Sequence, residues 1–69
     1  MGSYSEQPVE GMTVNERLYH FGLIGEFDAA MRARNAELGI SILIRAMLTR
    51  EQATSTVGAT LSDPKRYGY

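Results

Sequence analysis

The chain has 69 residues, no cysteine, seven basic and eight acidic side chains, and a net charge of −1. This length allows one domain with a small core, and the lack of cysteine excludes thiol catalysis and cysteine-based zinc sites. The balanced charge provides no long-range attraction for nucleic acid or anionic lipid. The longest apolar stretch, residues 40–48, is about half of a membrane span and contains Arg45, so we expect a cytoplasmic protein without a membrane segment.

The first eleven residues are polar and include two glycines and a proline. This composition predicts a disordered, flexible tail over 1–11, followed by one helical domain over 12–69. A signal peptide is not indicated, because the segment lacks both a cationic start and an apolar core. Met12 is an alternative natural start of the protein.

A first helix is predicted to begin after Thr13, because Thr13 and Glu16 form a capping box. In such a box, each of the two side chains bonds a backbone N–H that the first turn leaves free. Gly22 and Gly25 each weaken a helix, so they favour two helices divided around residues 22–25 over one bent helix.

A second helix is predicted in "EFDAAMRAR", which places acids early and arginines late, as the helix dipole favours. Asp28 and Arg32 are four residues apart, so we expect them to pair on its surface. Asn35 either ends this helix or caps a following one that starts at Ala36.

Residues 38–48 are the most apolar part of the chain, and their pattern fits two structures. Alternate apolar residues from Leu38 to Ile44 are typical of a strand, whereas Ile40, Leu43, Ile44 and Met47 share one helical face. We favour the helix, because no other segment provides a partner strand. Such a helix is apolar nearly all round, with Leu38, Ile42 and Ala46 off its main face, and needs further cover.

A last helix is predicted from the capping pair Thr49 and Gln52 to about Leu61 or Ser62, since Pro64 disfavours helical geometry at the residue before it. The closing segment "LSDPKRYGY" is then expected to turn back across the bundle. Tyr67 would cover apolar surface beside the short last helix, and Tyr69 would be frayed. The alternative is a docking peptide that contributes nothing to stability.

The predicted fold class is therefore all-α, a small bundle of three to four short helices with a flexible N-terminal tail. The predicted core consists of apolar residues from every helix: Val14, Leu18, Phe21, Leu23, Ile24, Phe27, Met31, Ile40, Leu43, Ile44, Met47, Val57 and Leu61.

Four motifs carry a resemblance to a known group of proteins: "NERLYHFGLIGEFDAA", the arginine-rich turn with Asn35, "TREQA" and "DPKRYG". In this order, over residues 12–69, they resemble short uncharacterised helical proteins of bacteria, often proteobacteria. The resemblance implies a small helical fold and a natural start at Met12. It implies no activity, cofactor or partner.

Residues suited to chemistry are few. His20 has Glu16 one turn before it, but this arrangement is more typical of an exposed helical pair than of an acid–base site. Glu26 and Asp28 are two residues apart and do not face each other on a helix. A metal site needs several converging ligands, and one histidine with scattered carboxylates does not provide them. We therefore expect no enzyme activity, no cofactor and no small-molecule substrate.

The sequence favours a small non-enzymatic protein-interaction module: a regulator, adaptor, inhibitor or accessory subunit of a larger bacterial or phage assembly. A protein partner or a second copy would cover the apolar helix. The candidate partner-binding residues are Leu38, Ile42, Arg45, Lys65, Arg66 and Tyr67. The alternative is a weak nucleic-acid-binding or transcription-regulatory protein, for which residues 49–67 have a faint helix-turn-helix character. A pI of about 5.7 and the lack of a long basic face argue against it.

Overall fold

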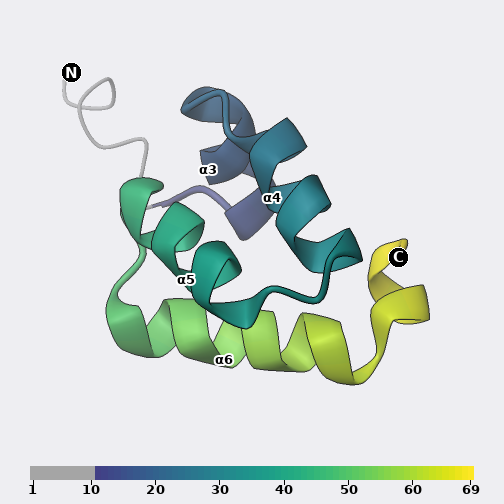
Figure 1. The fold of residues 1–69 in the computed structure, drawn as a ribbon. Coiled ribbons are helices and arrows are strands. Elements are labelled where there is room, and N and C mark those ends of the chain that lie inside the picture. Colours follow the sequence, from purple (N-terminus) through teal and green to yellow (C-terminus); the bar gives the residue numbers. More distant parts are fainter. Residues whose placement is uncertain (1–10) are drawn as a thin grey trace, which may run out of the picture.

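The computed structural model describes residues 11–69, which form four α-helices and one short 3₁₀ helix (Figure 1). With the labels of Figure 1, they are α3 (Val14–His20), α4 (Ile24–Arg32), α5 (Ala36–Arg45), α6 (Arg50–Ser62) and the 3₁₀ helix η1 (Pro64–Tyr67). The all-α prediction is confirmed. The pattern of residues 38–48 allowed either a helix or a strand, and the structure has a helix there. The expected flexible tail over 1–11 lies, apart from Gly11, outside the described residues.

The longest helix, α6, runs along one side of the bundle, and α5 packs across it (Figure 1). The next helix back along the chain, α4, contacts both α5 and α6, and α3 packs against α4. After η1 the chain turns back toward α4. Within residues 11–69, no helix is long and apolar enough to cross a membrane.

Three of the helices begin at side-chain caps that the sequence predicts. The Thr13–Glu16 capping box opens α3, and a second box of Thr49 and Gln52 opens α6, each with both reciprocal hydrogen bonds. Asn35 accepts a hydrogen bond from the Leu38 N–H at 3.1 Å, so it caps α5. Of its two predicted roles, the structure therefore selects the start of α5.

Three helices end in the same backbone arrangement, a Schellman motif. In this motif, two N–H groups beyond the helix bond two of its last carbonyls, around one residue in the left-handed conformation. That residue is Gly22 after α3, Arg34 after α4 and Met47 after α5, with φ of 70°, 58° and 75°. The residues that follow Gly22 and Met47 are Leu23 and Leu48, and both are buried. The motif thus ends all three helices, and after α3 and α5 it leads the chain into the core.

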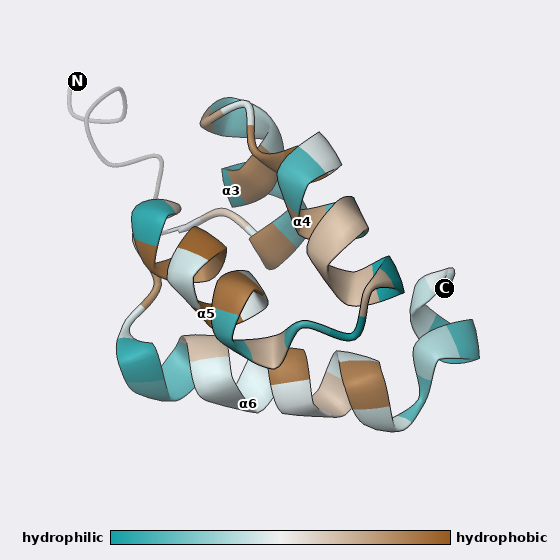
Figure 2. Cartoon of the chain, in the orientation of Figure 1, coloured by the Kyte–Doolittle hydropathy of each residue, from teal (hydrophilic) through white to brown (hydrophobic). Residues whose placement is uncertain are grey.

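The core lies mainly between α4, α5 and α6, and α3 adds Leu18 to it (Figure 2). Six of the predicted core residues are buried: Leu18, Leu23, Phe27, Met31, Leu43 and Val57. Three more pack at its edge: Val14, Ile40 and Leu61. The prediction was wrong for four residues, which are exposed: Phe21, Ile24, Ile44 and Met47. It missed five that are buried: Ala30, Ile42, Ala46, Leu48 and Ala53.

The errors on α5 have one cause, a small residue that lets another helix come close. A Cβ at Gly39 would collide with Met31 Cε and lie 3.2 Å from Val57 Cγ2, so position 39 faces the closest approach of α4 and α6. The buried face then runs through Gly39, Ile42, Leu43 and Ala46. A helix that is apolar all round does not reveal this choice by its periodicity.

Candidate functional site

The candidate partner-binding residues fall into two groups, one on α5 and one in η1. On α5, Leu38 has 45% of its surface exposed, and the Arg45 guanidinium forms an ion pair with Glu26 at 3.1 Å, which joins α5 to α4. Ile42 is wholly buried, so the prediction that it contacts a partner is corrected. Its side chain belongs to the core because it lies on the Gly39 side of α5.

A shallow groove of about 460 Å³ runs beside the exposed side of α5 and reaches the start of α6. Ile40 and Ile44 form its apolar part, and its polar border consists of Glu37, Ser41, Arg45 and Arg50. Ile44 is 36% exposed, so its side chain is open to contact from outside. We call the apolar residues Leu38, Ile40 and Ile44 the α5 surface, of which Ile40 and Ile44 line the groove and Leu38 does not.

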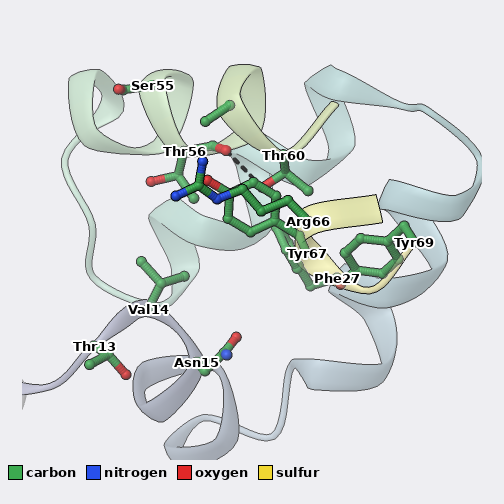
Figure 3. Close-up of a pocket in the computed structure, with 11 residues that line it drawn as sticks. Thr13, Val14, Asn15, Phe27, Ser55, Thr56, Thr60, Arg66, Tyr67 and Tyr69 are labelled. Atoms are coloured by element: carbon green, nitrogen blue, oxygen red, sulfur yellow. Dashed lines mark hydrogen bonds between the residues drawn. The ribbon is translucent and has the colours of Figure 1, made fainter. Parts of the chain in front are cut away.

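The second group lies in the closing segment, where Arg66 and Tyr67 line a larger groove of about 620 Å³ (Figure 3). From α3 and its cap, this groove is lined by Thr13, Val14 and Asn15; from α6, it is lined by Ser55, Thr56, Ala59 and Thr60. Phe27, Tyr67 and Tyr69 add aromatic rings, and Arg66 adds the one charged side chain. We call this depression the tail groove. Lys65, the remaining candidate, is exposed and does not line it.

The closing segment is held in place by Tyr69, and three predictions are corrected here. The Tyr69 hydroxyl donates to Asp28 Oδ1 at 2.5 Å, and the Arg32 guanidinium lies 5.6 Å from the centre of the Tyr69 ring. Tyr69 is therefore packed rather than frayed, whereas Tyr67, the ring expected to cover the bundle, is 46% exposed. Asp28 binds the Tyr69 hydroxyl and Arg32 lies over its ring, and the two do not form the expected ion pair with each other. We call these three residues the tail contact.

The backbone of this segment repeats the helix-ending pattern described above. Gly68 has φ of 90°, its N–H bonds the Lys65 carbonyl, and the Tyr69 N–H bonds the Pro64 carbonyl. A left-handed residue at position 68 turns the chain sharply enough to bring Tyr69 back to α4, and glycine adopts this conformation without steric cost. Burial is the main cause that raises the pKa of Tyr69 to about 12, followed by its hydrogen bond to Asp28 and the charge of that carboxylate.

The carboxylates considered for catalysis have structural partners. Glu16 accepts the Thr13 N–H in the capping box, Glu26 pairs with Arg45, and Asp28 holds Tyr69. His20 is exposed, with its ring edge-on to Phe21 at 4.8 Å between ring centres. Within residues 11–69, no group of three or more histidine or acidic side chains converges as a metal site would require.

Residues 49–67 contain one long helix followed by a single 3₁₀ turn, so they do not form the two helices of a helix-turn-helix motif. Pro64 lies at the point where a second helix would have to continue. Comparisons of the chain with protein-family models, with curated proteins and with solved structures found no match. The functional argument therefore rests on the surfaces themselves.

Of the functional features, sequence reasoning missed the tail groove and the role of Asp28. The groove joins residues from α3, α4, α6 and η1 that are far apart in the chain, and no local pattern predicts such a meeting. A signal for Asp28 does exist, because an acid and an arginine one turn apart can hold a tyrosine hydroxyl and ring together.

Proposed function

We propose that this protein is a small non-enzymatic interaction module, a regulator, adaptor, inhibitor or accessory subunit of a larger bacterial or phage assembly. The supporting observation is the apolar α5 surface, which remains open after the core has closed. Leu38 and Ile44 project from a helix whose opposite face is already packed against α4 and α6. Exposed large aliphatic residues beside a groove with charged residues of both signs at its edge are typical of a contact surface.

Burial of this surface would contribute useful binding energy. Removal of apolar surface from water stabilises a complex by about 25 cal/mol per Å², so two or three aliphatic side chains contribute a few kcal/mol before the costs of association. Glu37 and Arg50 at the edge would then orient polar groups of the partner, which affects specificity more than affinity.

The test compares the wild-type chain with a Leu38→Ser, Ile44→Ser double variant in a pull-down from native cells and in sedimentation. We expect one stoichiometric protein partner, or a second copy of the chain, that the double variant loses while its helicity is kept. Tyr19→Ser is the matched control, because Tyr19 is an exposed apolar residue on α3 and should not affect the complex.

A monomer that captures no protein partner would contradict the proposal. Nucleic acid in place of a protein in the captured material would favour the alternative, a weak nucleic-acid-binding regulator. In that case, loss of Lys65 and Arg66 should release the nucleic acid, and the substitutions on α5 should have no effect.

A further inference from the structure

We propose that the tail groove binds an acidic, extended segment of the partner protein, with Arg66 as the residue that recognises a carboxylate. This inference rests on the proposed interaction function and adds a second surface with its own ligand chemistry. It begins from the charges that line the groove. Arg66 is the one charged residue among them, and no acidic side chain lines the groove (Figure 3).

The position of Arg66 makes it available to a ligand. Its side chain extends from η1 over the groove toward Thr56 on α6 (Figure 3). Within residues 11–69, Arg66 forms neither an ion pair nor a side-chain hydrogen bond, whereas Arg17, Arg34 and Arg45 each bond a carbonyl or a carboxylate. A guanidinium presents a planar set of donors that matches a carboxylate, so an unused one in a groove favours an acidic ligand.

The other polar groups of the groove divide into occupied and unused ones. The Thr60 hydroxyl donates to the Thr56 carbonyl at 2.9 Å, and the Tyr69 hydroxyl donates to Asp28. Among the described residues, the side chains of Ser55, Asn15 and Tyr67 form no hydrogen bond, and each can donate one. Each of these groups can also accept a hydrogen bond, so they suit both the carbonyl and the N–H groups of a peptide backbone, and the donor-only Arg66 is the group that favours a carboxylate.

The apolar part of the groove indicates what accompanies the carboxylate. Val14 and the exposed Tyr67 ring lie beside the polar groups, above the buried Phe27, so an apolar side chain next to an acidic one would find contact there (Figure 3). The groove is open and is lined by α3, α4, α6 and η1, and a volume of about 620 Å³ falls within the usual range of ligand sites. An extended peptide with acidic and apolar residues in alternation fits this lining.

The probe is a labelled synthetic octapeptide in which two glutamates flank a phenylalanine, measured by fluorescence anisotropy against the full chain. Its control is the same peptide with glutamine in place of both glutamates. We expect Arg66→Gln to weaken binding of the acidic peptide about fivefold or more, as loss of a charge-assisted contact would. The glutamine peptide should bind the wild type weakly, and Arg66→Gln should change that binding less than twofold.

Lys65→Gln is the matched control, because it removes the same charge from the neighbouring residue without altering the groove lining. Binding of the acidic peptide should change less than twofold in this variant. Amide signals of Ser55, Thr56 and Tyr67 should also shift in two-dimensional NMR spectra when the acidic peptide is added.

Three results would overturn the inference: equal binding of the two peptides, equal effects of the two substitutions, or tighter binding of a single-stranded oligonucleotide at the same groove. The proposed function fails separately, if the wild-type chain captures no protein and forms no oligomer. If capture of a protein partner depends on Leu38 and Ile44 but the peptide does not bind, the proposed interaction function stands and the assignment of the tail groove is wrong.

Discussion

Replacement of Tyr69 by phenylalanine removes one hydroxyl and keeps the ring, so it isolates the hydrogen bond to Asp28. A hydrogen bond to a charged group contributes about 1.5–3 kcal/mol to stability. Asp28 is only partly buried, so water replaces part of the lost contact, and we expect a loss near the lower limit, about 1.5 kcal/mol. For a domain of this size, such a loss lowers the melting temperature by roughly 6–12 °C.

The assay is urea unfolding at neutral pH, followed by helical circular dichroism. Tyr67→Phe is the control, because the Tyr67 hydroxyl forms no hydrogen bond with residues 11–69, and the free energy of unfolding should change by less than about 0.5 kcal/mol. If Tyr69→Phe is as stable as the wild type, the tail contact does not hold the closing segment and our account of it is wrong.

The same contact predicts how stability changes at high pH. The pKa of Tyr69 is raised from 10.0 to about 12, so the native state holds the neutral phenol while the unfolded chain begins to lose its proton near pH 10. The stability that this shift represents is complete below pH 10 and is lost as pH rises toward about 12. The wild type should lose stability over this interval more steeply than Tyr69→Phe. Parallel curves for the two proteins would contradict the raised pKa.

Two further substitutions test the backbone and the core. Met47→Gly should raise the free energy of unfolding, measured in urea, by about 1 kcal/mol, because glycine removes the cost of a left-handed backbone. Met47→Ala keeps that cost and should not raise the free energy of unfolding. Ile42→Lys should abolish helical circular dichroism through a loss of more than about 4 kcal/mol, whereas Leu38→Lys on the same helix should stay folded. A folded Ile42→Lys monomer would contradict the assignment of Ile42 to the core.

The starts of α3, α5 and α6 were predictable because their signals are contained in four consecutive residues, whereas α4 begins at Ile24 without a side-chain cap, two residues before the segment predicted for it. Thr13 with Glu16, and Thr49 with Gln52, satisfy free N–H groups of their own first turn and need no distant partner. The ends were harder to predict. Glycine at position 22 is the usual left-handed residue, but an arginine and a methionine hold the same conformation at positions 34 and 47. Neither arginine nor methionine is a residue type that predicts a left-handed helix end.

The surfaces were less predictable than the helices, because they depend on how the helices pack. On α5 the buried face is decided by the close approach at Gly39, so Ile42 lies inside and Ile44 outside. In the closing segment, two tyrosines are two residues apart, and the turn at Gly68 decides which ring returns to α4. These outcomes follow from three-dimensional geometry that the composition and the spacing of the residues do not contain.

The sequence separation of the tail contact has a consequence for the order of folding. Short turns join α3, α4, α5 and α6, so most of the bundle assembles from segments that are neighbours in the chain and should form quickly. The bond between Tyr69 and Asp28 spans 41 residues, and its closure becomes favourable only once the helices between them are in place. An interaction that forms after the rate-limiting step affects mainly the rate of unfolding. The closing segment would thus determine how long the folded protein lasts, while the helices determine how fast it forms.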